Sequence, residues 1–250
     1  MGGALLTRWK TQFPDYRFDV IEPNAEGKWH KNLAALPQDY HPDIIVFAVK
    51  PQELEKILPE YRTRFAAKPL YMSIAAGKDT AFFKKALGEH AHVVRAMPNT
   101  PALVGESMSV LYAADTLPAS ARNLATQLMQ AVGKVEWLTD ESLMDAVTAL
   151  SGSGPAYVFL FLDALTKAGV AAGLPEAMAK TLAMQTVHGS LALAGQSAEG
   201  FEQLRKNVTS PGGTTEAALK ILMKDGALET LVKEAVSAAV RRSMEMSNGK

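Results

Sequence analysis

The alternation of short apolar runs with helical stretches between residues 43 and 139 constrains the fold more than any other feature of the chain. Stretches with helical spacing, such as PQELEKILPEYRTRF and PASARNLATQLMQAVG, separate apolar runs, several of which are apolar throughout. Strands of this kind that alternate with helices indicate a mostly parallel sheet covered on both faces. We therefore predict an α/β domain with strands at 43–49, 69–75, 92–97, 108–114 and 134–139.

Three loops follow the carboxyl ends of predicted strands: AVKPQ, AAGKD and MPNTP. Each loop taken alone is best explained as a turn, because all three contain small residues, prolines or both. Open parallel sheets, however, bind ligands in the crevice outside the carboxyl ends of their strands. The three loops together therefore predict the edge at which a ligand binds.

After Glu141 the strand signal stops, and residues rich in Ala, Leu, Met and Phe follow with helical spacing as far as a break at SPGGTT. A second helical block follows the break. The segment YVFLFLDAL at 157–165 is apolar around most of its circumference, and such a helix has to be buried on all sides. About 110 residues of helix are too few to achieve this alone, so we predict an obligate homodimer.

The composition argues against several classes of function. Lys and Arg number 26, and Asp and Glu also number 26, so no overall charge attracts nucleic acid or an anionic membrane. The longest apolar run is far shorter than the ~20 residues that a membrane span requires. The five histidines lack metal-ligand spacing, so we predict no bound metal. The absence of Cys agrees with a reducing compartment, and we predict a cytoplasmic protein.

The stretch NVTSPGGTTEAAL at 207–219 carries the clearest chemical signal. Pro211, Gly212 and Gly213 break one helix, and either Thr214 or Thr215 can cap the next. Consecutive backbone N–H groups at a helix N-terminus bind anions, and the neighbouring hydroxyl groups add donors. A simple cap needs one hydroxyl and no double glycine. The additional hydroxyl groups and the double glycine therefore favour a site for a small carboxylate or phosphate.

Three long motifs, RAMPNTPALVG, LSGSGPAYVFLFLDAL and VTSPGGTTEAAL, occur in this order, with DIIVFAVKP and SIAAG upstream. Together they resemble pyrroline-5-carboxylate reductase over nearly the whole chain. The resemblance implies a Rossmann-like dinucleotide-binding domain at 1–140 and an all-helical, interleaved dimerisation domain at 141–250. It also implies an oxidoreductase that reduces a cyclic imine acid to L-proline in the last step of proline biosynthesis. The implied cofactor is NADP(H), with NAD(H) as the alternative.

The resemblance further assigns roles to individual residues. Backbone N–H groups at the double-glycine turn would hold the substrate carboxylate, and the hydroxyl of Thr215, the predicted catalytic residue, would hydrogen-bond the ring nitrogen. Glu141 would reach the same pocket from the domain junction. The implied substrate-binding residues are Asn207, Ser210, Gly213, Thr214, Thr215 and Glu141. The implied cofactor-binding residues are Gly2, Asn24, Ala48, Val49, Lys50, Pro51, Ala75, Ala76, Gly77 and Asn99.

The N-terminal part departs from the family pattern. A helix-like stretch begins at Gly2, and Tyr16 to Ile21 read as an extended strand. Family members begin with a strand and a Gly-x-Gly-x-x-Gly loop, and Met1-Gly2 resembles the end of that loop. We therefore expect an incomplete Rossmann-like domain that lacks the first strand and two glycines. We attribute this to a misplaced start rather than a truncated copy, because nothing downstream looks degenerate.

Three questions stay open at this level. Glu22 occupies the position that meets the adenosine ribose, where an acid accepts from a 2′-hydroxyl and repels a 2′-phosphate. This favours NADH locally, whereas the family favours NADPH. The second question is whether the chain is a β-hydroxyacid dehydrogenase. Such an enzyme needs a lysine as general acid or base near the nicotinamide, on the long helix between the domains. Lys167 lies on that helix, but about three turns past its start, which is too far along. The third question is whether the chain is a truncated paralogue that dimerises without binding nucleotide.

Overall fold

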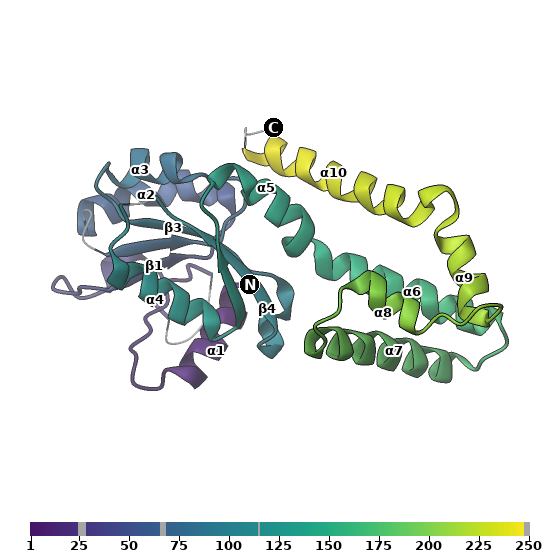
Figure 1. Ribbon diagram of the computed structural model, residues 1–250. Helices are drawn as coiled ribbons and strands as arrows, with labels where there is room; N and C mark the ends of the chain where they lie inside the picture. The colour runs from purple at the N-terminus through teal and green to yellow at the C-terminus, as the bar shows by residue number, and fades with distance from the viewer. Residues whose placement is uncertain (25–28, 66–68, 115, 248–250) are drawn as a thin grey trace. The chain divides into compact units, whose positions relative to one another are not determined.

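The computed structural model describes residues 1–24, 29–65, 69–114 and 116–247 (Figure 1). The chain divides into two compact units. The sheet unit comprises Met1–Ser153 and Ala239–Lys250, and the helical unit comprises Gly154–Ala238. The predicted order, an α/β part followed by an all-helical part, is confirmed. The predicted boundary at residue 140 stays a prediction.

Five strands form one sheet in the order β1-β2-β3-β4-β5. The strands are β1 (Ile44–Phe47), β2 (Leu70–Ser73), β3 (Val93–Met97), β4 (Ser107–Tyr112) and β5 (Gly133–Trp137). Each lies within its predicted range or starts one residue before it. All pairs are parallel except β3 and β4, which are antiparallel. Only the short helix η2 (Thr100–Val104) separates these two, and a parallel pair needs a longer crossover.

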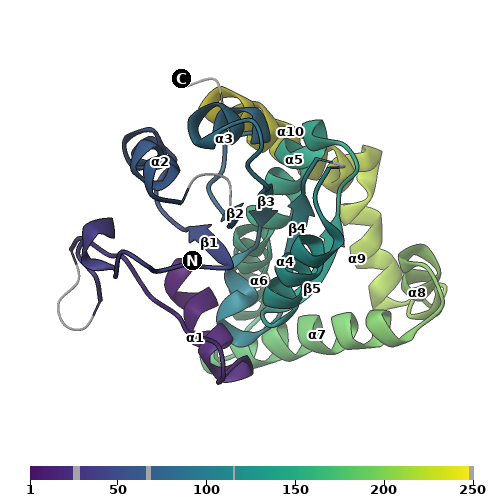
Figure 2. The same ribbon diagram turned by 90° about the vertical axis from the view of Figure 1, so that its left-hand side faces the viewer.

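Helices cover both faces of the sheet (Figure 2). One face packs against α1 (Gly2–Gln12) and α4 (Ala119–Gln130), and the other against α2 (Pro51–Phe65) and α3 (Thr80–Leu87). In β2, Met72 belongs to the first apolar cluster and Tyr71 to the second. Successive side chains of a strand point to opposite faces, so apolar residues at every position build two cores.

The predicted strand at 16–21 does not join the sheet, so this prediction was wrong. Ile21 forms a single bridge with His30, in which His30 N donates to Val20 O and Glu22 N to His30 O, both at 2.9 Å. Phe18 stacks on Trp9 of α1, with the ring centroids 6.5 Å apart. The apolar side of this segment is thus buried against a helix.

The helical unit contains α6 (Gly154–Ala171), α7 (Glu176–Gln196), α8 (Phe201–Asn207), α9 (Thr214–Leu222) and the short η5 (Lys224–Gly226). Helix α10 (Ala227–Ser247) begins in this unit and ends in the sheet unit. α6 and α7 approach closely, because a Cβ at Gly169 would lie 3.0 Å from the Cβ of Ala179. Gly169 thus permits the contact between the two helices.

The helical unit lacks an apolar core of its own. All of residues 154–238 are described, and Ala179 and Ala183 are the only apolar residues among them that are buried. Phe159 and Leu160 on α6 are 65% and 68% exposed. Monomeric proteins rarely expose continuous apolar surface of this kind. Within the described part of the chain, no helix combines the length and hydropathy that a membrane crossing needs.

Candidate active site

The three loops predicted to bind a ligand lie at one edge of the sheet. Strands β1, β2 and β3 are neighbours and parallel, with Phe47 opposite Ser73 and Ser73 opposite Arg95. Ile74 N, just beyond β2, donates to Phe47 O at 3.1 Å. The edge carries Ala48, Val49, Lys50 and Pro51 after β1, Ala75, Ala76 and Gly77 after β2, and Asn99 after β3. The structure therefore brings eight of the ten predicted cofactor residues to one edge.

Gly2 reaches the same edge from helix α1. A Cβ at Gly2 would lie 2.7 Å from the Cβ of Ala48, closer than real Cβ atoms approach. Helix α1 starts at Gly2 without a hydrogen bond from a capping side chain. Its first backbone N–H groups have no acceptor within the helix, and such groups bind phosphate. A close-packed glycine at an uncapped helix start fits the last glycine of a dinucleotide-binding loop.

We expect Gly2→Ala to lower the free energy of unfolding by about 1–3 kcal/mol, because the added methyl group forces α1 away from Ala48. Gly3→Ala is the matched control, since a Cβ at Gly3 meets no atom within 4 Å. The control is expected to raise stability by about 0.5–1 kcal/mol through helix propensity. Urea unfolding of the two variants measures both changes. Equal effects of the same sign would contradict the close packing.

Asn99 is buried and its side chain is fully engaged. Its Oδ1 accepts from Ser107 Oγ at 3.1 Å and from Met108 N at 3.0 Å. Its Nδ2 donates to Ser151 O at 3.1 Å. These bonds join the loop after β3 to the start of β4 and to η4 (Thr148–Gly152), a short π-helical turn. Asn99 therefore shapes this edge, whatever its contact with a ligand.

Asn24, another predicted cofactor residue, lies in an exposed turn near the end of the misassigned strand. Its N–H donates to Glu22 Oε1 at 3.2 Å, so the carboxylate of Glu22 is bound to its own turn. Upstream, burial alone would raise the pKa of Asp19, but hydrogen bonds from Arg17, Tyr40 and His30 lower it overall. Burial and the contact with Asp19 raise the pKa of Tyr40 to about 12. This cluster holds the segment that leads to Glu22.

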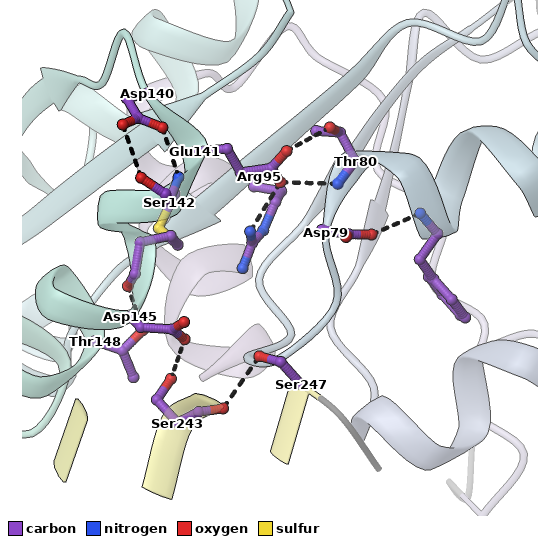
Figure 3. Close-up of polar contacts among 12 residues, drawn as sticks. Asp79, Thr80, Arg95, Asp140, Glu141, Ser142, Asp145, Thr148, Ser243 and Ser247 are labelled. Carbon is purple, nitrogen blue, oxygen red and sulfur yellow. Dashed lines mark hydrogen bonds and ion pairs between the residues drawn. The ribbon is translucent and has the colours of Figure 1, made fainter. Parts of the chain in front are cut away.

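Glu141, in η3 (Glu141–Leu143), uses both carboxylate oxygens inside the sheet unit (Figure 3). Oε1 accepts from Arg95 Nη1 and from Thr80 N, both at 2.8 Å, and Oε2 accepts from Thr80 Oγ1 at 2.6 Å. The side chains of Arg95 and Glu141 are 9% and 21% exposed. The predicted role of Glu141 in substrate binding stays a prediction, while its present contacts link β3, α3 and η3.

The start of α9 is the strongest candidate for an anion site. Gly213 is the residue that precedes the helix, and no side chain caps it, so the prediction that Thr214 or Thr215 caps the helix was wrong. Thr214 and Thr215 instead form its first turn, where their N–H groups lack acceptors within the helix. Gly213 N donates to Ser210 O at 3.0 Å and thereby closes the turn. The helix dipole adds positive potential at this end.

Charged residues lie along the two helices that flank this turn. Glu216 Oε2 accepts from Gly212 N at 2.9 Å and lies 3.4 Å from Lys220 Nζ. A hollow of about 420 Å³ between α8 and α9 is lined in part by Arg205, Lys206, Lys220 and Lys224. Lys206 also pairs with Glu202 at 2.7 Å, so two of these four cations are already matched by carboxylates, and no residue of 210–215 lines the hollow.

The predicted substrate residues fall in different units. Ser210, Gly213, Thr214 and Thr215 lie together in the double-glycine turn, whereas Glu141 lies in the sheet unit. Asn207 ends α8, and its Nδ2 donates to Glu199 Oε2 at 2.7 Å. The described residues contain no cluster of His, Cys, Asp or Glu that could hold a metal ion.

Sequence reasoning missed Arg95 and Thr80, the partners of Glu141. A signal for Arg95 was present, because it is the one charged residue in the apolar run VVRAM. A charge in a buried strand requires a partner of opposite sign. No comparable signal marks Thr80, whose position after Asp79 reads only as the start of a helix.

Comparisons with known proteins agree with this geometry. Residues 141–246 match a family model described as pyrroline-5-carboxylate reductase dimerisation. The pyrroline-5-carboxylate reductase of Pseudomonas aeruginosa is 41% identical over 233 residues, which cover 93% of this chain and 81% of the relative.

Two solved structures resemble both the sequence and the fold. A pyrroline-5-carboxylate reductase from Coxiella burnetii is 41% identical, with a TM-score of 0.77 over 82% of this chain and 76% of that chain. A pyrroline carboxylate reductase from Plasmodium falciparum, solved with NADP bound, is 34% identical, with a TM-score of 0.76 over 82% and 77%. Identity of this level over most of both chains, together with the double-glycine turn and the three loops, shows that the chain belongs to the pyrroline-5-carboxylate reductase family.

Proposed function

We propose that this chain reduces 1-pyrroline-5-carboxylate to L-proline with NAD(P)H, the last step of proline biosynthesis. The observation that carries the proposal is the start of α9, where uncapped amides follow a double-glycine turn. A small carboxylate fits such a site, because the N–H groups of the first turn and the helix dipole both favour a negative charge. The relative from Pseudomonas aeruginosa, which is named for this reaction, supports it.

In this proposal, the amides of Gly213, Thr214 and Thr215 hold the substrate carboxylate. The hydroxyl of Thr215 hydrogen-bonds the ring nitrogen and orients the C=N bond, and Asn207 and Ser210 line the pocket. The protonated imine is already electrophilic, so the reaction needs positioning of two flat rings more than a strong base. The nitrogen carries its proton into the product, so the chain only has to keep that proton in place.

The sheet edge fits a dinucleotide, because Gly2 lets the uncapped start of α1 pack directly against Ala48 at the end of β1. The uncapped start of α1 would hold the phosphates, and Lys50, which is exposed, would neutralise one of them. The loop at 75–77 and Asn99 would face the nicotinamide end of the cofactor. When bound, the reduced nicotinamide supplies a hydride to the carbon of the C=N bond. We propose NADP(H) as the cofactor, with NAD(H) as the alternative that Glu22 favours.

We further propose that the enzyme is a cytoplasmic homodimer, or a larger homo-oligomer, joined through the helical unit. The exposed apolar residues of α6 support the oligomer, since a second copy would cover them. The lack of Cys agrees with a reducing compartment.

Leu160→Glu is expected to weaken association by at least about a hundredfold, because an unpaired charge would be buried in the interface. Sedimentation equilibrium measures the change. Lys10→Glu, on an exposed position of α1, is the control and should leave association unchanged. A wild-type chain that sediments as a monomer would contradict the proposed assembly.

The reaction itself is tested with the purified chain, 1-pyrroline-5-carboxylate and NADPH or NADH, by the fall in nicotinamide absorbance. Saturable turnover with the imine, and none with a 3-hydroxy acid and NADP⁺, is the expected result. A parallel fluorescence titration with NADPH tests the paralogue that binds no nucleotide, since that protein would show no change. The alternative of a β-hydroxyacid dehydrogenase would need Lys167 as general acid or base. Lys167 instead forms an exposed ion pair with Asp163 at 2.6 Å, which does not favour this role.

A further inference from the structure

The loop at 75–79, here called the cofactor loop, is held at both ends, and Figure 3 shows the contacts at its second end. At its start, Ala75 N donates to Ser73 Oγ at 3.2 Å. At its end, the next residue, Thr80, donates to Glu141 through both its N–H and its hydroxyl, at 2.8 and 2.6 Å. Asp79 in addition accepts from Phe82 N at 2.7 Å and caps α3. The loop is therefore fixed relative to β2 and η3.

The middle of the loop is covered by the end of α10, within the same unit. Gly77 has φ of +73°, and a Cβ there would lie 3.2 Å from the backbone of Met246 and Ser247. Ser243, one turn earlier and 5% exposed, donates through Oγ to Asp145 Oδ1 at 2.6 Å. Ser247 Oγ donates to Ser243 O at 3.1 Å. These bonds anchor the last turn of α10 against the loop.

Glu141 itself is oriented by Arg95. In the strand register, Arg95 of β3 is the partner of Ser73 of β2, the residue that holds the start of the loop. A charge-assisted hydrogen bond of 2.8 Å between a buried Arg and a carboxylate leaves the carboxylate little freedom to rotate. The end of the cofactor loop is thus held by Glu141, which Arg95 orients, and its start is held by Ser73 on the neighbouring strand.

We infer that Glu141, Thr80 and Ser243 are positioning residues, which hold the cofactor loop in the shape that receives the dinucleotide. None of these three residues needs to touch the dinucleotide. A loop that is already ordered loses less conformational entropy on binding, so the affinity for the nucleotide is higher. The inference rests on the proposed function, because it assumes that the loop contacts NADPH.

Thr80→Val tests the inference, because valine keeps the shape of threonine and removes only the hydroxyl bond to Glu141. Glu141→Ala is less suitable, since it leaves Arg95 buried without a partner and threatens folding. Thr80→Val is expected to raise the Kd for NADPH about tenfold, as for the loss of one hydrogen bond to a charged group. The KM for 1-pyrroline-5-carboxylate should change less than about twofold, since the inference leaves the α9 turn untouched.

Three further variants make the test specific. Thr80→Ser restores the hydroxyl and should return the Kd for NADPH to within about twofold of wild type. Thr63→Val removes a hydroxyl whose one hydrogen bond within the described residues is to Pro59 O in α2, and should leave both constants unchanged. Ser243→Ala, which frees the last turn of α10, should raise the Kd for NADPH in the same direction as Thr80→Val.

Hydrogen exchange of the ligand-free protein provides a readout that does not require nucleotide. Faster exchange at 75–80 in Thr80→Val, with the rest of the sheet unit unchanged, is the expected result. An unchanged Kd in Thr80→Val, or equal rises in the constants for NADPH and imine, would overturn the inference and leave the proposed function intact. A wild-type chain that binds neither NADPH nor NADH would overturn the proposed function, and with it the role of the loop.

Discussion

Glu141→Ala is expected to lower the free energy of unfolding by about 3 kcal/mol, at the lower end of the cost of breaking a buried ion pair. The loss is large because Arg95, 7% exposed, would keep its charge without a partner, and Thr80 would lose two hydrogen bonds. The lower end applies because Glu141 retains a fifth of its side-chain surface in water. For a chain of this size the melting temperature should fall by roughly 6–12 °C in calorimetry.

Two comparisons isolate the buried charge as the cause. Glu53→Ala removes an exposed carboxylate that pairs with Lys56 at 2.9 Å, and such pairs contribute only about 0–1 kcal/mol. Combining Glu141→Ala with Arg95→Met removes both charges, and should cost less than Glu141→Ala alone. If the double variant were the less stable of the two, the explanation by an unpaired buried charge would be wrong.

Thr215→Ala is expected to lower turnover ~10–100-fold, because one oriented hydrogen bond of ~1.5–3 kcal/mol to a charged ring nitrogen would be lost. Thr215 lies in the first turn of α9 and is exposed in the single chain, so its hydroxyl is available to a ligand. The backbone amide remains in the variant, so the site still binds the carboxylate. The change should therefore appear in kcat more than in KM, as stopped-flow reduction of the imine by NADPH would measure.

Thr215→Ser keeps the hydroxyl and should retain most of the activity. Thr181→Ala serves as the matched control in the same unit, since that hydroxyl bonds only Ala177 O within α7. Thr215→Ala with the turnover of wild type would remove Thr215 from the mechanism, although the carboxylate site at the α9 amides could still be correct.

The sheet could be predicted because its signals are local. An apolar run such as DIIVFAV indicates a strand that helices cover on both faces, and β1 lies inside that run at Ile44–Phe47. The stretch PQELEKILPEYRTRF has helical periodicity and begins with proline, and α2 covers the same residues, Pro51–Phe65. The stretch at 16–21 shows the limit, because Phe18 found its apolar partner on α1 rather than in a sheet.

The carboxylate network shows the same limit at the level of side chains. Glu141 was singled out from a motif, but its partners Arg95 and Thr80 are 46 and 61 residues away in the chain. The position of Arg95 in an apolar strand indicated only that it needs a partner of opposite charge. No feature of the sequence indicated a role for Thr80. Likewise, Gly77 was identified as a loop residue. Its contact with the end of α10 depends on the path by which the C-terminal helix packs back against the sheet unit.

The amino-acid sequence by itself determined the five strands of the sheet, most helices, the double-glycine turn and the family, because each depends on neighbours within a few residues or on the order of motifs. Only the tertiary structure decided that β4 runs antiparallel to β3, that Gly2 packs on Ala48, and that Glu141 binds Arg95 and Thr80. The physical reason is distance along the chain. A contact between remote residues is set by the packing of whole elements, and no local periodicity records which remote side chains that packing brings together.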